Sequence, residues 1–566
     1  MRTIRPIGPI RPPEWLIQSA AEVGELSVAL IRSGVWRSAG PAQLVRIERA
    51  LRTWGQSMAA LGVIAAIRWP DRAAVISGDH QLTYAELDRR CERIAAGLHA
   101  QYNIVAGSKV AVLCRNHIGF LEATLAASRI GADVLFVNTE FAPPQLAAVL
   151  ERHRPDLLVH DAEFAAPPGL PAVVSSPAGL RPGKNGAAGG EGGGDGTGGG
   201  TGGGSTVALD ELAESRAAGA PTPDSAGHIT ILTSGTTGTP KAAPRVPTAA
   251  GLAGLTASAL SRFGVRSGEP VIIGPPLFHG LGLLTSMLAL FLGAPLVLRP
   301  RFDAATLLAD VEKNRAGAVV AVPVMLRRLL ELGPTAIAEY DLHSLRAVIS
   351  GASQLGVPLA ERFIERFGPV LCDAYGSSEV GIATIANSAD LLDAPGTVGR
   401  PCLGSSIRIL DDQDHEVPTG TTGRIFAGGG LVFGGYSDGS SKTVVDGRMS
   451  TGDLGHLDNA GRLFVDGRED DMIVSGGENV YPVEVEECLA AHPAVAEAVV
   501  TGVPDDDFGQ RLVAYVVLRE PATEDELIAH VKANLARYKT PRQIVILDEF
   551  PRNATGKVLR IKLTPP

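Results

Sequence analysis

The sequence predicts an α/β protein with a large N-terminal domain and a small α+β C-terminal domain. At 566 residues, the chain is too long for one ordinary hydrophobic core, so we expect two or more domains. From about Arg72 onward, short apolar runs alternate with helical segments, which is typical of parallel βαβ units. The C-terminal region instead mixes the two kinds of element, with predicted helices at 483–491 and 524–535 and strands near 495–501 and 512–518.

Composition and charge limit the classes of function. Hydrophobic residues make up 45% of the chain and charged residues 20%, as in globular soluble proteins. The net charge of −10, without a basic cluster, argues against nucleic-acid binding. The five cysteines are odd in number and form no CxxC pair, so we expect a reducing cytoplasmic environment and no structural metal site. They are Cys91, Cys114, Cys372, Cys402 and Cys488.

The first segment, residues 1–65, is arginine-rich and precedes the alternating pattern. An apolar, helical stretch at 15–36 is interrupted by Glu22, Glu25 and Arg32, so it cannot cross a bilayer cheaply. It also lacks the layout of a cleavable signal peptide. Two interpretations stay open: a helical hairpin packed on the first domain, which we favour, and an interfacial helix in peripheral contact with the inner face of the cell membrane.

The large domain is predicted to span residues 66–467. Thr83 and Glu86 form a capping box that opens a helix to about residue 100. Strands are then expected at 110–113, 133–137, 157–159, 228–232, 271–273 and 319–324, with helices between them. Residues 183–206 are mostly glycine and cannot bury enough apolar area to offset their backbone entropy, so we expect a disordered surface insertion.

The most informative stretch is a glycine- and threonine-rich loop that follows the apolar strand at 228–232. Glycines let backbone N–H groups turn toward one point, and such concavities bind phosphate. The hydroxyls add donors, and the lysine adds a mobile positive charge. The spacing differs from Walker A, because only two residues separate the glycines. The loop residues are Thr233, Ser234, Gly235, Thr236, Thr237, Gly238 and Lys241.

This loop resembles the phosphate loop of the adenylate-forming enzymes, which include acyl-CoA synthetases, firefly luciferase and peptide-synthetase adenylation domains. Further matching segments follow in the same order at 276–282, 345–353, 374–379, 450–454, 466–486 and 551–560. The resemblance covers roughly residues 65–566. It implies stacked mixed sheets in the large domain and a mobile small domain at 468–566. Within this superfamily, the chain looks most similar to bacterial long-chain fatty-acid–CoA ligases.

The resemblance also implies roles for single residues. Glu379 would bind Mg²⁺, Lys241 would contact the β- and γ-phosphates of ATP, Lys557 would bridge the carboxylate and the α-phosphate, and His279 would lie between adenylate and acyl chain. Besides the phosphate loop, the nucleotide would contact Gly351, Ala352, Ser353, Ala374, Tyr375, Gly376, Ser377, Ser378, Asp453 and Arg468. The acyl pocket would include His279, Gly282, Pro323, Met325 and Gly381. Asp470 would be the hinge, and Gly476 and Gly477 would line a tunnel for CoA.

The residue types suit these roles. A tyrosine ring at 375 can stack on a purine, and a glutamate at 379 offers the hard oxygen that magnesium prefers. Asp453 lies in a glycine turn, where a short carboxylate can accept both ribose hydroxyls. Amino-acid-activating relatives usually have an aspartate where this chain has Phe278-His279, which favours an acid without an α-amino group.

The implied function is ATP-dependent activation of a fatty acid as an acyl-adenylate, followed by transfer to CoA. The apolar stretch 277–292 favours a medium or long chain. Four alternatives stay open: an acyl-AMP ligase that loads a carrier protein, a ligase of aryl or other carboxylic acids, a peptide-synthetase adenylation module, and a nucleotide-binding sensor without catalysis.

Overall fold

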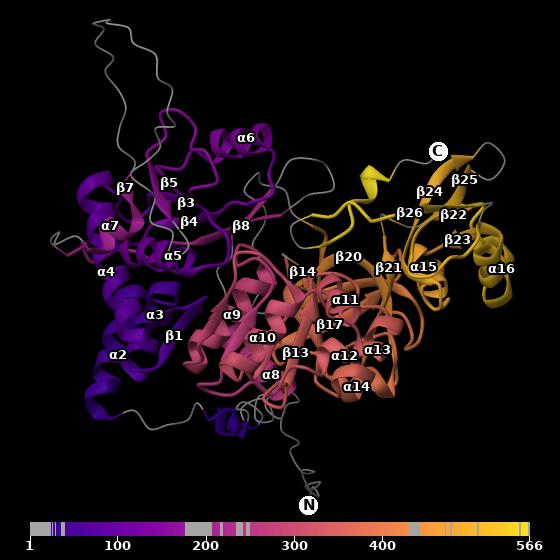
Figure 1. Ribbon diagram of the computed structural model, residues 1–566, viewed down its shortest axis with the longest axis horizontal. Coiled ribbons are helices and arrows are strands. Elements are labelled where there is room, and N and C mark those ends of the chain that lie inside the picture. The colour runs from indigo at the N-terminus through magenta and orange to yellow at the C-terminus, as the bar shows by residue number, and fades with distance from the viewer. Residues whose placement is uncertain are drawn as a thin grey trace, which may run out of the picture.

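A computed structural model describes most of the chain: residues 24, 27, 28, 30–34, 40–175, 207–214, 219–233, 241–244, 249–377, 379–429, 442–469, 471, 473–475, 478–505, 509–553 and 556–563. It is an α/β protein in which a large N-terminal domain is followed by a small C-terminal domain (Figure 1). The small domain lies at one end of the molecule, next to β20 and β21 of the large domain. The predicted fold class is therefore confirmed.

The first sheet of the large domain has seven described strands in the order β7-β6-β5-β3-β4-β8-β9. All neighbours are parallel except β8 and β9, which form an antiparallel pair. The strands are β3 (Lys109–Leu113), β4 (Asp133–Phe136), β5 (Leu157–Asp161), β6 (Ala172–Ser175), β7 (Val207–Ala208), β8 (Ile229–Thr233) and β9 (Lys241–Pro244). The accompanying helices are α4 (Tyr84–Tyr102), α5 (Ile118–Ile130), α6 (Pro143–His153) and α7 (Leu209–Glu214).

The second sheet has fourteen described strands and continues from a parallel half into an antiparallel half. Strands β1, β11, β10, β12, β13 and β14 run parallel, and the strands after β14 pair antiparallel. The parallel half and its antiparallel edge strand β2 comprise β1 (Ala73–Ser77), β2 (His80–Thr83), β10 (Val271–Ile273), β11 (Leu296–Leu298), β12 (Ala318–Val320), β13 (Ala347–Gly351) and β14 (Leu371–Ser377). The other half comprises β15 (Gly381–Ala386), β16 (Thr397–Pro401), β17 (Ser405–Leu410), β18 (Gly423–Gly429), β19 (Val444–Val445), β20 (Arg448–Leu457) and β21 (Leu463–Arg468).

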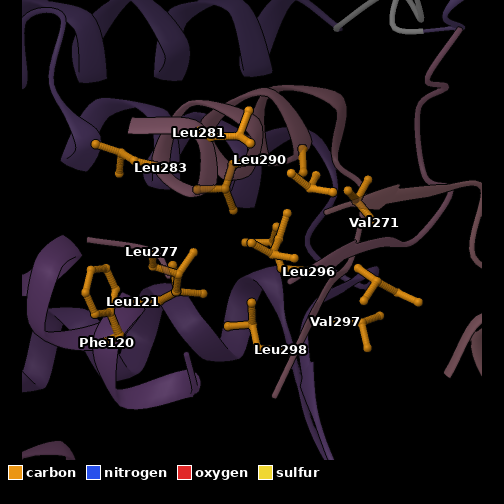
Figure 2. Packing of buried hydrophobic residues seen from close by; sticks show 14 of the residues in the cluster. Phe120, Leu121, Val271, Leu277, Leu281, Leu283, Leu290, Leu296, Val297 and Leu298 are labelled. Atoms are coloured by element: carbon orange, nitrogen blue, oxygen red, sulfur yellow. The ribbon is translucent and has the colours of Figure 1, made fainter. Parts of the chain in front are cut away.

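Helices cover the parallel half of this sheet. They are α8 (Ala249–Phe263), α9 (Gly280–Leu292), α10 (Ala304–Asn314), α11 (Pro323–Glu331), α12 (Gly333–Ile337), α13 (Val357–Phe367) and α14 (Ser388–Asp393). Figure 2 shows leucines of α9 packing with Phe120 and Leu121 of α5 and with the apolar strands β10 and β11. Because α5 is buried between the two sheets, almost all its residues are apolar or small. This shared core joins the two sheets into one domain.

The small domain has its own core, formed where α15 (Pro482–Ala490) and α16 (Glu524–Asn534) pack on a five-stranded sheet. The strands are β22 (Ile473–Ser475), β23 (Glu478–Val480), β24 (Val495–Asp505), β25 (Gly509–Leu518) and β26 (Gln543–Leu547). Pro482 occupies the first turn of α15, where its missing N–H is tolerated. The predicted helix at 483–491 is thus found within one residue.

The N-terminal segment ends in a helical hairpin, α2 (Pro41–Trp54) and α3 (Met58–Arg68). Trp54 donates its indole N–H to the carbonyl of Arg129 at 3.0 Å, and Met58 and Ala65 belong to the core of the large domain. A domain boundary at residue 65 would fall inside α3, so this helix is part of the large domain. None of the helices in the described part of the chain has the length and apolar character needed to cross a bilayer.

Two other expectations concern local structure. Thr83 and Glu86 form the predicted capping box at the start of α4, with Thr83 N donating to Glu86 Oε2 at 2.8 Å. The strand expected at 319–324 is wrong in its second half, because β12 ends at Val320 and Pro323 begins α11. Proline lacks the N–H that a central strand needs but fits the first turn of a helix. The predicted glycine-rich insertion at 183–206 lies outside the described residues.

Candidate functional site

The main candidate site is a cleft of about 1130 Å³ between the two domains. The large domain lines it with the first turns of α9 and α11, the turn after β13, and parts of β14, β20 and β21. The small domain lines it with α15 and with the loop that contains Arg552 and Lys557. Segments more than two hundred residues apart in the sequence thus face one space.

Asp453 is at the centre of a polar cluster in this cleft. Its carboxylate accepts a hydrogen bond from the Tyr375 hydroxyl at 2.6 Å and another from Arg468 Nη1 at 3.2 Å. Asp453 and Arg468 face each other across β20 and β21, which explains their proximity. Burial raises the pKa of Asp453, whereas the Tyr375 bond and the charges of Arg468 and Lys557 lower it. A carboxylate with these partners can accept hydrogen bonds from a ligand's hydroxyl groups.

Lys557 faces the same cluster from the C-terminal tail. Its turn is closed by backbone bonds, since Asn553 N donates to the Lys557 carbonyl and Lys557 N donates to Asn553 Oδ1, each at 2.9 Å. Gly556 occupies this turn with a φ of 77°, which favours glycine. Partial desolvation in the cleft lowers the pKa of the Lys557 ammonium, the charge of Arg468 lowers it further, and the carboxylates of Asp471 and Asp453 oppose this effect. Although Lys557 remains exposed to the cleft, its charge interacts with the Asp453 cluster.

The turn after β13 and the strand β14 form another wall. Ala352 has a φ of 66°, a left-handed conformation that is strained for a residue with a side chain. Gly376 faces Gly381 so closely that a Cβ at 376 would lie 1.8 Å from the Gly381 carbonyl oxygen. Beyond it, Ser377 Oγ accepts from the backbone N–H of Glu379 at 3.2 Å, and Glu379 is buried in the cleft wall.

Asp373 is a cleft residue that the sequence analysis missed. It lies on β14, it is buried, and among the described residues no hydrogen-bond partner reaches its Oδ1 atom. Burial raises its pKa to about 7. Its cross-strand neighbour Ser350 also has a buried hydroxyl without a partner in the described structure. An aspartate inside the otherwise apolar strand Leu371–Ala374 was the available signal, because a buried carboxylate needs a partner that a ligand can provide.

His279 marks the apolar end of the cleft. It precedes α9 without a side-chain cap bond, and its Nε2 atom is buried with no partner in the described residues. Burial lowers its pKa to about 4, so the imidazole is neutral near pH 7. Nearby lining residues are apolar: Ile231, Leu232, Leu281, Leu284 and Val324. This end of the cleft can enclose an apolar group beside a neutral ring nitrogen.

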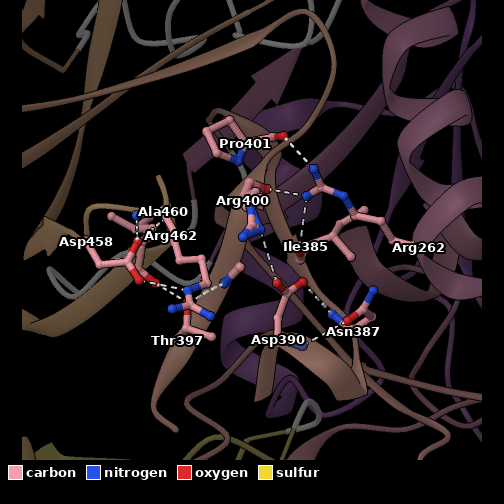
Figure 3. Close-up of polar contacts among 12 residues, drawn as sticks. Arg262, Ile385, Asn387, Asp390, Thr397, Arg400, Pro401, Asp458, Ala460 and Arg462 are labelled. Atoms are coloured by element: carbon pink, nitrogen blue, oxygen red, sulfur yellow. Dashed lines mark hydrogen bonds and ion pairs between the residues drawn. The ribbon is translucent and has the colours of Figure 1, made fainter. Parts of the chain in front are cut away.

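Hydrogen bonds from Arg262, which we call the polar frame, hold the strands next to the cleft. Figure 3 shows Arg262 of α8 pointing at the carbonyls of Ile385, Arg400 and Pro401, to which it donates at 3.0, 2.6 and 3.2 Å. These bonds attach α8 to β15 and β16. Since β15 pairs with β14, the frame holds the strand that carries Tyr375.

Two family models match this chain. The "AMP-binding enzyme" model matches residues 64–437, and the "AMP-binding enzyme C-terminal domain" model matches residues 484–557. The chain belongs to the AMP-binding enzyme family. The first match lies within the large domain and the second within the small domain.

Curated relatives of this AMP-binding enzyme include two acid–CoA ligases. The 2-succinylbenzoate–CoA ligase of Bacillus cereus is 32% identical over 87% of this chain and 95% of the relative. The indoleacetate–CoA ligase of Aromatoleum aromaticum is 33% identical over 86% of this chain and 94% of the relative. The expected likeness to long-chain fatty-acid–CoA ligases is not supported by these relatives.

Solved structures agree on the architecture of the AMP-binding enzyme. The o-succinylbenzoate CoA synthetase (MenE) of Bacillus subtilis, in complex with its acyl-adenylate intermediate OSB-AMP, has a TM-score of 0.75 at 29% identity, over 89% of this chain and 98% of that one. ATP-bound MatB of Rhodopseudomonas palustris has a TM-score of 0.74 at 26% identity, over 91% of this chain and 97% of that one.

The structure places most of the predicted site residues of this AMP-binding enzyme around one cleft. The lining residues include His279, Pro323, Ala352, Ser353, Ala374, Tyr375, Gly376, Ser377, Glu379, Gly381, Asp453, Arg468 and Lys557. Gly351 ends β13 beside Ala374 and immediately precedes the lining turn.

Two residues expected in the acyl pocket are not among the described lining residues. A Cβ at Gly282 would lie 2.4 Å from the Pro276 carbonyl oxygen, so this glycine permits close packing between α9 and the preceding loop. Met325 is buried on α11 with its sulfur against Gly274. Its position on the core side of α11 follows from the helix that replaces the expected strand.

Several predicted residues lie outside the described part of the chain: Ser234, Gly235, Thr236, Thr237, Gly238, Ser378, Asp470, Gly476 and Gly477. Thr233 and Lys241 pair across β8 and β9. Strand β8 thus continues one residue past Leu232 of the cleft wall, to Thr233.

Proposed function

We propose that this protein is an AMP-forming ligase that joins an aromatic carboxylic acid to CoA. ATP and Mg²⁺ would support formation of an acyl-adenylate, and CoA would then take the acyl group. The observation that carries the proposal is the convergence of Lys557, Arg468, Asp453 and Tyr375, from both domains, on one cleft. Membership of the AMP-binding enzyme family supports the proposal that this cleft binds an adenine nucleotide.

In the first half-reaction, a carboxylate oxygen of the acid attacks the α-phosphorus of ATP, and the bond to the pyrophosphate oxygen breaks. This reaction needs alignment and charge neutralisation more than a base. Lys557 would neutralise charge that develops between the carboxylate and the α-phosphate, while Asp453 would accept from the ribose hydroxyls. The phosphate loop from Thr233 to Lys241 would hold the β- and γ-phosphates.

Glu379 fits the magnesium role, because it is a buried carboxylate in the cleft wall close to Ser377. A bound Mg²⁺ would offset phosphate charge. Asp373 would accept a hydrogen bond from an N–H group of the base, since its Oδ1 has no partner in the described structure and Asp373 lines the cleft together with Ala374 and Tyr375.

In the second half-reaction, the CoA thiolate attacks the acyl carbonyl and AMP leaves. We propose that the small domain first rotates about Asp470, withdraws Lys557 and brings Gly476 and Gly477 to a path for CoA. Solved complexes of a relative, one with its acyl-adenylate intermediate and one with ATP and a magnesium ion, support an acyl-adenylate as the species that is formed from ATP.

An aromatic acid is favoured over a fatty acid. Succinylbenzoate and indoleacetate, the acids in the names of the two relatives, both contain an aromatic ring. The pocket at His279 offers apolar walls and a neutral imidazole, and the adjacent Phe278 ring lies 4.9 Å from that imidazole. An uncharged aromatic ring can pack against such a wall.

A panel of acids tests this proposal. The purified protein is given ATP, Mg²⁺ and CoA with 2-succinylbenzoate, indoleacetate, benzoate, decanoate or palmitate, and pyrophosphate and the thioester are measured. We expect an aryl acid to give the highest kcat/KM, by roughly tenfold or more over the straight-chain acids. A preference for decanoate or palmitate would overturn the assignment of an aromatic substrate. A lack of AMP formation with every acid would overturn the assignment as a ligase.

The same panel, run with acyl carrier protein in place of CoA, tests the carrier-loading alternative. We expect thioester formation with CoA only. Faster transfer to the carrier protein than to CoA would contradict the proposed acceptor.

A further inference from the structure

A cluster of charged side chains connects the two domains in the wall of the cleft. Arg327 of α11, in the large domain, forms an ion pair with Glu497 of β24, in the small domain, with 2.5 Å between Nη1 and Oε1. The other oxygen of Glu497 pairs with Arg552, in the C-terminal tail. The three side chains are mostly buried, with exposed fractions of 21% for Arg327, 16% for Glu497 and 19% for Arg552. One carboxylate therefore serves two arginines from different domains.

This cluster is connected to the turn that carries Lys557. Arg552 Nη1 donates to the carbonyl of Gly556 at 2.7 Å, and Gly556 directly precedes Lys557. The same turn packs on α11, since a Cβ at Gly556 would lie 2.3 Å from Val324 Cγ1. The contacts thus run from α11 through Glu497 and Arg552 to the backbone beside Lys557.

Charge balance makes Glu497 the critical member. Arg552 lies close enough to Arg327 to repel it, and Arg519 of the small domain is also in range. Burial disfavours the charged form of Arg327, and Glu497 is the strongest influence that opposes this effect. A buried charge that loses its partner is strongly unfavourable. The carboxylate of Glu497 therefore compensates the arginine charges at this contact between the domains. Another polar contact between the domains, from Gln354 Nε2 to Glu487 Oε1 at 3.4 Å, is longer and exposed.

We propose that Glu497 is a positioning residue for adenylation. It couples the Lys557 turn to α11 through Arg327, and this ion pair separates when the small domain rotates for transfer to CoA. This inference rests on the proposed function. It implies that loss of the pair slows the first half-reaction and leaves the second unaffected or faster, because only the first requires the present orientation.

Arg327→Gln is the most direct test, because it removes the interdomain pair and leaves Glu497 with Arg552. Adenylation is measured as acid-dependent exchange of pyrophosphate into ATP, and transfer is measured from synthetic acyl-adenylate and CoA. We expect exchange to fall by about tenfold or more and transfer to stay within about twofold of wild type. Arg328→Gln, at the exposed neighbour on the same helix, is the matched control and should change neither rate. An equal fall in both half-reactions, or no change in either, would overturn the proposal.

A second measurement does not depend on finding the acid. Amide hydrogen exchange is compared among wild type, Arg327→Gln, Glu497→Gln and Arg328→Gln without substrate. Both pair variants should exchange faster at 323–331 and 552–558, with the small-domain helix α16 unchanged, whereas the control should match wild type. Unaltered exchange at these segments would overturn the positioning role. A wild-type protein inactive with every acid, but with this exchange pattern, would count against the ligase assignment alone.

Discussion

At the residue scale, burial decides the chemistry of the cleft side chains more than their intrinsic properties do. His279 is neutral because its ring is desolvated, and Asp373 has a pKa of about 7 for the same reason. The carboxylate of Asp453 is also buried, but both of its oxygens have hydrogen-bond donors. Tyr375 donates to Oδ2 and Arg468 donates to Oδ1. The sequence supports the choice of Asp453, but it contains no measure of the burial that distinguishes Asp373.

The shifted pKa of His279 predicts a pH dependence of stability. Its pKa of about 4 in the folded protein lies below the ordinary 6.5, so between these values the unfolded chain binds more protons. The contribution of His279 is therefore complete above about pH 6.5 and is lost as the pH falls toward 4. Between pH 7 and pH 5, wild type should lose about 2 kcal/mol of unfolding free energy through this residue.

His279→Gln should lack this part of the dependence, as measured by urea unfolding at the two pH values. His343→Gln, at a side chain that is 98% exposed, is the control and should keep it. An equal pH dependence of the unfolding free energy in wild type and His279→Gln would contradict the conclusion that the imidazole of His279 is neutral in the folded protein.

At the element scale, the pair β14–β15 brings Tyr375 and Glu379 to the cleft. The strands approach so closely at Gly376 and Gly381 that no side chain fits between them. The sequence resemblance implied that Gly376 contacts the nucleotide, and the structure shows in addition that the backbone of the next strand lies against it.

Gly376→Ala should therefore disrupt this strand pair. The added Cβ would lie 1.8 Å from the Gly381 carbonyl oxygen, so the backbone must shift, and we expect a loss of about 1–3 kcal/mol in unfolding free energy together with weaker AMP binding. Gly219→Ala is the control, because nothing lies within 4 Å of a Cβ there. Thermal unfolding and calorimetric titration with AMP provide the measurements. Unchanged AMP binding in Gly376→Ala would show that the strand pair does not shape the nucleotide site.

At the scale of the whole molecule, the C-terminal tail returns to the large domain and completes one wall of the cleft. Lys557 is separated from Asp453 by about a hundred residues, yet their charges influence each other. The proposed rotation would separate them. A lysine that contributes to one orientation only should affect one half-reaction only.

Lys557→Ala should thus lose adenylation and keep transfer. We expect pyrophosphate exchange to fall by about a hundredfold or more, because a charge placed at the developing transition state is removed. Thioester formation from synthetic acyl-adenylate and CoA should remain close to wild type. Lys562→Ala, an exposed lysine of the same tail, is the control for general effects on the tail. Equal losses in the rates of adenylation and transfer would contradict the proposal that Lys557 acts in adenylation only.

The sequence by itself determined the fold class, the capping box of α4 and the order of the motifs, because these depend on local patterns of hydrophobicity, turn residues and spacing. It did not determine that Pro323 begins a helix, that Met325 faces the core or that Asp373 Oδ1 is buried without a hydrogen-bond partner in the part of the chain that the structure describes. Each of these depends on what packs against the residue from elsewhere in the chain. The interdomain pair of Arg327 and Glu497 is the clearest case, since 170 positions separate two charges that only the tertiary structure brings to 2.5 Å.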